Sequence, residues 1–200
     1  MSRKADPDHP VHDLIAARWS PYGFSDRSVS DDDLRSLFEA VRWAASSYNE
    51  QPWRFIVARR EEAAHFERVL SCLVEGNQPW ARLAPVLVLT AVSLSFSRND
   101  KPNAAAVHDM GLAAGNLTFE ATSRGLSVHQ MIGILPDKAR EVFAIPAGFQ
   151  ALTGLAIGYA GHQEGLPDDI KSRDEGARSR KSITEFTFGA TWGESAGWAR

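Results

Sequence analysis

The feature that most constrains the fold is the alternation of helical and strand patterns along the chain. Ser30 precedes "DDDLRSLFEAVRWAA", where Asp33 has the spacing of a capping-box partner and three aspartates favour a helix N-terminus. Apolar residues recur there at helical spacing and predict one buried face: Leu34, Leu37, Phe38, Val41 and Ala45. The next apolar run, "WRFIVAR" at 53–59, is typical of a strand.

Further elements follow in the same alternation. We expect helices over 9–18, 61–75, 104–125 and 136–145, strands over 84–92 and 149–161, and a strand or loop over 126–135. The helix over 104–125 consists mostly of small residues with few charges, which predicts burial nearly all round and close approach of another backbone. The chain is therefore expected to form one α+β or α/β domain over 1–200. About 1–11 would be a flexible N-terminus and about 163–200 a polar C-terminal arm.

Composition narrows the class of protein. The formal net charge is −3 in 200 residues, which argues against a nucleic-acid-binding or membrane-surface protein. The single cysteine, Cys72, excludes an intrachain disulfide framework and fits a reducing compartment. The first residues have no apolar signal core, so a cytoplasmic protein is expected.

The usual catalytic motifs are missing from the sequence. It contains no G-x-S-x-G elbow, Walker loop, H-E-x-x-H or C-x-x-C, and "GLAIGYAG" lacks G-x-G-x-x-G spacing and indicates close backbone packing instead. His9 and His12 have no third ligand nearby, so no metal site is predicted. Cys72 is interpreted as a small core residue. His108 and Asp109 are adjacent, and adjacent helix residues are not expected to face each other.

Three polar clusters remain as candidate binding residues. Arg18 and Ser20 lie where a helix gives way to a turn, and a second corner between helix and strand carries Ser46, Ser47, Asn49 and Gln51. Arg178 and Arg180 follow near the C-terminus. Arginine with serine suits a phosphate, and hydroxyls with amides suit a flat heterocycle. The alternative interpretation is a helix cap, a turn and two solvated charged segments.

The same residues also carry a family resemblance. "RWSPYGF", followed by a helix and "SSYNEQPWRF", resembles the N-terminal signature of the FMN-dependent nitroreductase family. The resemblance continues through "NQPWARLAPVLVLTA", "HDMGLAAGNLTFEATSRGLSVHQMIG" and "RSRKSITEFTFGATWG", and covers roughly residues 12–193. It implies a mixed sheet flanked by helices, in an intertwined homodimer whose C-terminal arm docks on the partner subunit.

The resemblance also implies roles for individual residues. Arg18 and Ser20 would hold the FMN phosphate together with Arg178 and Arg180, and Trp19 and Tyr22 belong to the same motif. Ser46, Ser47, Asn49 and Gln51 would lie along the flavin, in many relatives from the partner subunit. Backbone N–H groups at Met131, Ile132 and Gly133 would face flavin N5 and O4. Two departures are visible: Ala45 stands where the family often has proline, and Tyr22 replaces the usual arginine or lysine.

The expected function is therefore an FMN-dependent oxidoreductase. NADH or NADPH would reduce the flavin, and a nitroaromatic, quinone or similar electron-poor small molecule would then accept hydride in a ping-pong cycle, with no protein acid or base required. One alternative is a flavin-binding storage or sensing protein without turnover. Another is a cofactor-free interaction module of the same fold.

Overall fold

The computed structural model describes residues 3–161 and 164–199, and its centre is a four-stranded sheet. The strands are β1 (Trp53–Arg59), β2 (Val86–Ser93), β3 (Ser127–Met131) and β4 (Phe149–Gly158), in the order β1-β2-β4-β3. The predicted α+β class is confirmed. All three strand pairings are antiparallel, so the expected mixed character is not seen within the described residues.

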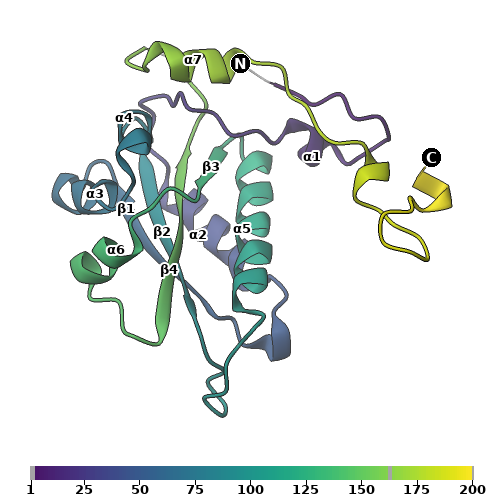
Figure 1. The fold of residues 1–200 in the computed structure, drawn as a ribbon. Coiled ribbons are helices and arrows are strands. Elements are labelled where there is room, and N and C mark those ends of the chain that lie inside the picture. The colour runs from purple at the N-terminus through teal and green to yellow at the C-terminus, as the bar shows by residue number, and fades with distance from the viewer. Residues whose placement is uncertain (1–2, 162–163, 200) are drawn as a thin grey trace.

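Helices cover both faces of the sheet (Figure 1). The long helices α2 (Asp31–Arg42) and α5 (Ala106–Ser123) pack together on one face. On the other face lie α3 (Ala63–Leu70), α4 (Gln78–Ala81) and α6 (Pro136–Phe143). The remaining α-helices, α1 (Asp13–Ala17) and α7 (Asp168–Glu175), lie near the end of the sheet where β4 stops. Four short 3-10 helices complete the element order, at Ser47–Asn49, Glu75–Asn77, Ile183–Glu185 and Gly197–Ala199.

The central strand β2 divides the core into two layers. Val86 and Val88 pack among the residues of α2 and α5, whereas Leu87 and Leu89 pack towards α3 and α4. This alternation follows from the two-residue period of a strand, and all four side chains are almost fully buried. Such continuous apolar runs are what a strand covered on both faces requires.

Most predicted elements form, with shifted ends. Helix α2 begins at the predicted cap, where the Ser30 hydroxyl accepts a hydrogen bond from the Asp33 N–H. It ends at Arg42, so Ala44 is buried and the prediction that Ala45 is buried is wrong. The helices predicted over 9–18 and 61–75 are shorter than expected, and α4 and α7 were not predicted.

Helix α5 is not buried all round within one chain. Val107 is 54% exposed, Leu112 40% and Phe119 38%, whereas Ala113, Leu117 and Ala121 on the sheet side have no exposure. The prediction of burial on all sides is therefore wrong for a single chain. The exposed face carries large apolar side chains of the kind that interfaces use.

The glycines of β4 and the segment after it permit close backbone contacts, as predicted. A Cβ on Gly158 would lie 2.5 Å from Pro85 Cδ, and one on Gly161 would lie 2.3 Å from the backbone nitrogen of Ser25. These positions bring the segment around Phe24 against the end of the sheet, where Phe24 forms a bridge with Ala160.

The N-terminal segment and the C-terminal segment (residues 176–199) run together away from the sheet (Figure 1). The Ala5 N–H donates to the Ala16 carbonyl, and Lys4 pairs with Asp13 at 2.8 Å. The C-terminal segment exposes large aromatics, with Trp192 88% and Trp198 75% accessible. Residue 163, where the arm was predicted to begin, lies outside the described residues. Over residues 3–161 and 164–199, every helix is too short or too polar to cross a membrane.

Candidate functional site

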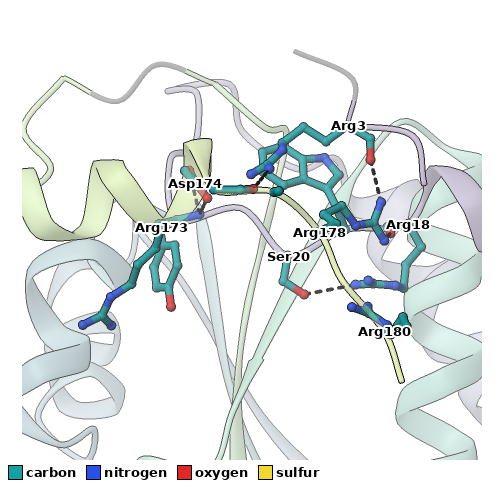
Figure 2. A pocket seen from close by; sticks show the side chains of 11 residues that line it. Arg3, Arg18, Ser20, Arg173, Asp174, Arg178 and Arg180 are labelled. Atoms are coloured by element: carbon teal, nitrogen blue, oxygen red, sulfur yellow. Dashed lines mark hydrogen bonds between the residues drawn. The ribbon is translucent and has the colours of Figure 1, made fainter. Parts of the chain in front are cut away.

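A cationic cavity of about 230 Å³ lies where the N-terminal and C-terminal segments meet the end of the sheet (Figure 2). The side chains around it come from both segments, α7 and the turn after α1: Arg3, Arg18, Trp19, Ser20, Tyr22, Arg173, Asp174, Arg178 and Arg180, with backbone from Gly176 and Ala177. The structure thus brings two of the three predicted polar clusters together, although they are about 160 residues apart in sequence.

Arg18 and Ser20 form the inner wall of the cavity. An Nη1–H group of Arg18 donates to the Ser20 hydroxyl at 3.1 Å, which holds both groups side by side (Figure 2). Partial burial lowers the pKa of Arg18, and the nearby charges of Arg178 and Arg180 lower it further. This guanidinium is therefore a partly desolvated cation that would be stabilised by an anion.

Four of the five arginines that line the cavity form no ion pair with a described carboxylate, although Asp174 also lines it. Within the described ranges, Arg3, Arg18, Arg178 and Arg180 have no carboxylate within ion-pairing distance. Arg173 differs, since it pairs with Asp169 at 3.6 Å and in Figure 2 points away from the other guanidinium groups. Four mutually repelling cations around one cavity are the electrostatic pattern of an anion site.

Arg178 uses its guanidinium to brace the cavity wall. Its Nη atoms donate to the backbone carbonyls of Arg3, Ala16 and Arg18, the last at 3.0 Å. Arg3 in turn donates to the Gly176 carbonyl, and its guanidinium lies 5.6 Å from the centroid of the Trp19 ring. These bonds join the N-terminal segment, the end of α1 and the C-terminal segment. The positive charge of Arg178 still lies at the cavity.

Asp174 fixes the far wall. This side chain is buried, with 5% of the residue exposed, and its carboxylate accepts hydrogen bonds from the N–H groups of Tyr22 and Gly23 at 3.1–3.2 Å. It therefore attaches α7 to the turn that carries Ser20. Asp174 was not among the predicted site residues.

The Tyr22 ring packs inward beside the cavity. It lies edge-on to Trp80 and to His129, with centroids 5.0 Å and 4.5 Å away. The Nδ1 atom of His129 lies 2.9 Å from the Pro21 carbonyl, and burial lowers the pKa of this histidine. The imidazole is thus held neutral behind the turn that carries Ser20.

The polar corner at residues 46–51 has a strained backbone. Tyr48, Asn49 and Gln51 have φ values of +53°, +55° and +51°, which side chains larger than glycine rarely adopt. The Ser46 hydroxyl accepts from the Gln51 N–H at 3.1 Å, and the Gln51 amide donates to the Asn49 side chain. The corner is more than a simple helix cap, because such strain persists only where surrounding bonds impose it.

Asp109, at the start of α5, imposes part of this geometry. Its buried carboxylate accepts from the Ser47 N–H at 2.9 Å, and its other oxygen lies 3.2 Å from Nδ1 of His108. The expectation that His108 and Asp109 would not meet is wrong. Neighbouring helix residues point about 100° apart, but the imidazole is long enough to turn towards the short carboxylate. A cavity of about 290 Å³ lies here, lined by Ala45, Ser46, Ser47, Ala105, His108, Asp109 and Leu112.

The loop at residues 131–133 lies on the edge of the sheet between these two regions. Met131 is buried, whereas Ile132 is 80% exposed. The Gly133 carbonyl accepts hydrogen bonds from the Val74 N–H at 3.1 Å and from the Asn77 amide at 3.0 Å. A Cβ on Gly133 would lie 2.5 Å from that amide nitrogen, so only glycine fits here without displacing Asn77.

The cationic cavity and the polar corner lie at opposite ends of the sheet. The corner precedes β1, whose first residue, Trp53, pairs with Val92 of β2. Val92 in turn pairs with Gln150, near the start of β4, whereas the cavity adjoins the segment after Gly158, where β4 ends. The ten residues of β4 rise about 3.3 Å each, so roughly 30 Å separate the two regions. One copy of the chain therefore does not combine all the predicted binding residues into one site.

Cys72 and His12 make structural contacts in the folded chain. Cys72 is fully buried, its pKa is raised by burial, and it packs in the core as expected. His12 caps α1. In the parts of the chain that the structure covers, no three histidine, cysteine or acidic side chains are arranged to hold a metal ion.

The α+β fold described above is that of the nitroreductase family. The family description "Nitroreductase family" matches residues 15–159, and the chain belongs to this family. The protein is an oxidoreductase of this family.

Individual relatives agree with this assignment. The chain is 36% identical over 197 residues to the major NAD(P)H-flavin oxidoreductase of Aliivibrio fischeri, with 76% of this chain and 88% of the relative covered. A crystal structure described as an oxidoreductase containing FMN superposes with a TM-score of 0.89 at 31% identity, covering 98% of this chain and 99% of that one. A putative nitroreductase from Desulfovibrio desulfuricans, solved with FMN, has a TM-score of 0.70 at 23% identity and covers 93% and 99%, which supports the fold.

Proposed function

We propose that the protein is an FMN-dependent oxidoreductase that uses NADH or NADPH to reduce an electron-poor small molecule, such as a nitroaromatic compound or a quinone. The observation that carries the proposal is the cavity at Arg18: among the residues that the structure describes, four of its arginines have no carboxylate within 4.0 Å, and the Ser20 hydroxyl lies beside Arg18. A phosphate ester fits this donor set, because it offers several acceptor oxygens and up to two negative charges.

The phosphate end of FMN would be held chiefly by Arg18, Ser20 and Arg180. Arg18 has unoccupied N–H donors besides the one that bonds Ser20, and Arg180 is exposed beside it in Figure 2. Arg178 would act mainly by fixing the wall, since its Nη atoms already bond three carbonyls, and by adding charge. Asp174 keeps the Tyr22 and Gly23 N–H groups occupied and so holds the turn in place.

The flavin ring system would be enclosed by two copies of the chain. The loop at Ile132 and Gly133 would contribute backbone N–H groups from one copy, and the corner at Ser46, Ser47, Asn49 and Gln51 would come from the other. This arrangement accounts for the roughly 30 Å between cavity and corner in one chain. It also accounts for the exposed apolar residues of α5 and for the exposed aromatics of the C-terminal segment, which we expect to dock on the partner.

In this homodimer, each chain would form one domain whose C-terminal segment packs on the surface of the partner subunit. When bound, FMN supplies the hydride chemistry, and the protein binds, orients and shields the reactants. Donor and acceptor would use one site in turn, which predicts ping-pong steady-state kinetics. No side chain is required as acid or base.

The test combines a spectrum with turnover. Purified protein titrated with FMN should develop the absorbance of a bound flavin and then oxidise NADH or NADPH when menadione or a nitroaromatic compound is added. A protein that stays colourless at saturating FMN would contradict cofactor binding. Bound flavin without turnover would contradict the enzymatic proposal and favour storage or sensing.

A further inference from the structure

An exposed aromatic group beside the polar corner has no role in the site described so far. The Tyr48 ring is 74% exposed although its backbone is strained, with φ at +53°. A left-handed backbone at a bulky residue costs about 1–3 kcal/mol. The folded chain therefore holds a large aromatic side chain in solvent at an energetic cost.

The loop between β2 and α5 builds a cluster around this ring. The Arg98 guanidinium lies 4.1 Å from the Tyr48 ring centroid, and Phe96 meets Tyr48 edge-on at 5.8 Å. The loop is tied to the corner, since the Ser97 N–H donates to Glu50 Oε1 at 2.8 Å. It is also closed on itself by the bond from the Phe96 N–H to the Lys101 carbonyl. The cluster of Tyr48, Phe96 and Arg98 is hereafter the Tyr48 platform.

The charge of Arg98 is available. Throughout residues 3–161 and 164–199, no carboxylate lies within 4.0 Å of its guanidinium. A cation over an exposed ring contributes only about 0.5–1 kcal/mol, which does not offset the backbone strain. The contact with Arg98 therefore does not by itself account for the exposed position of the strained Tyr48.

We propose that the Tyr48 platform recognises the electron acceptor and selects flat aromatic acceptors that carry a carboxylate or sulfonate. The open face of Tyr48 takes the aromatic ring, and free N–H groups of Arg98 take the anionic substituent. This inference rests on the proposed oxidoreductase function, which makes the corner next to Tyr48 part of the flavin site.

Turnover of a matched pair of acceptors tests the selectivity. 4-Nitrobenzoate and its methyl ester share the nitroarene and differ in charge. In Arg98→Gln, the ratio of kcat/KM for acid over ester should fall about five- to tenfold through KM. Tyr48→Asn, which suits a left-handed backbone, should raise KM for both compounds. Arg82→Gln changes another exposed arginine and is the control. An unchanged ratio in Arg98→Gln would overturn the proposal.

Binding without turnover separates this proposal from the proposed function. Redox-inert naphthalene-2-sulfonate should bind the FMN-titrated protein in calorimetry, and Arg98→Gln should weaken that binding about five- to tenfold. Equal binding to both proteins would overturn the platform even if turnover persists. If Tyr48→Asn instead shifted the protein between monomer and dimer in sedimentation, Tyr48 would be an interface residue and the proposal would be wrong. Loss of NAD(P)H oxidation with the neutral ester would refute the oxidoreductase function alone.

Discussion

Replacing Arg18 should weaken the binding of a flavin that carries a phosphate and leave the binding of a flavin without one almost unchanged. Arg18 is part-buried, no carboxylate of residues 3–161 and 164–199 pairs with it, and it is aligned by its bond to Ser20. A hydrogen bond to a charged group contributes about 1.5–3 kcal/mol net. Arg18→Gln should therefore weaken FMN binding about ten- to 150-fold. Riboflavin, which lacks the phosphate, should bind the unaltered protein and Arg18→Gln with almost equal affinity.

Arg178 provides a matched contrast in the same cavity. Its Nη atoms hold the carbonyls of Arg3, Ala16 and Arg18, so Arg178→Gln removes a brace rather than a direct ligand. We expect Arg178→Gln to weaken FMN and riboflavin binding together and to lower the unfolding temperature. Arg82→Gln changes an exposed arginine that is not part of the cavity lining and should change the binding of neither ligand.

The assay is a fluorescence titration of both flavins against the three variants, repeated at low and high salt. The FMN loss in Arg18→Gln should shrink as salt rises, because screening already weakens the lost interaction. If riboflavin lost as much affinity as FMN in Arg18→Gln, the cavity would not be the phosphate site.

Four further outcomes follow from the geometry. Gly133→Ala should weaken flavin binding several-fold in titration, because its Cβ would displace the Asn77 amide; unchanged affinity would contradict the predicted backbone role. Burial lowers the pKa of His129 in the folded chain. As the pH falls below about 6.5, this histidine is therefore protonated in the unfolded chain before it is protonated in the folded chain. The free energy of unfolding should thus rise with pH up to about 6.5, by about 1.4 kcal/mol for each unit by which the pKa is lowered. In urea unfolding at a series of pH values, His129→Gln should show a weaker loss of stability at acid pH. Deleting residues 173–200 should release FMN and weaken dimerisation together in sedimentation; a full-length monomer with bound flavin would contradict this. Tyr22→Lys should raise the two-electron potential of bound flavin by tens of millivolts, by adding a cation near the reduced ring. An unchanged potential would place Tyr22 away from the ring edge.

The parts of the fold that could be predicted are those in which apolar residues recur at a clear helical or strand spacing. The buried strand β2 and the capped helix α2 follow directly from apolar spacing and from Ser30. Helix α7 could not be predicted in the same way, because its residues are almost all polar. Its buried residues are Ile170 and Asp174, and one isoleucine gives the sequence no apolar stripe.

The residue types of the candidate site could be predicted from the sequence more fully than the contacts that these residues make. Arg18, Ser20 and Arg180 stand out because arginine and serine are phosphate ligands, and they do lie together. That Arg178 bonds carbonyls, and that Arg3 joins the cavity, depends on contacts between distant segments that no local pattern encodes. The sequence did contain a signal for Asp109, which is one of only two acidic residues in α5, but its partner Ser47 could not be predicted from the sequence.

The separation of the cavity from the corner has a genetic consequence if two copies complete each site. A chain damaged only at Arg18 and a chain damaged only at Asn49 would each be inactive alone. When co-expressed, they would form some mixed dimers in which one site receives both lesions and the other receives neither. Half of the sites in such hybrids would be intact, so two loss-of-function alleles would complement each other within one gene.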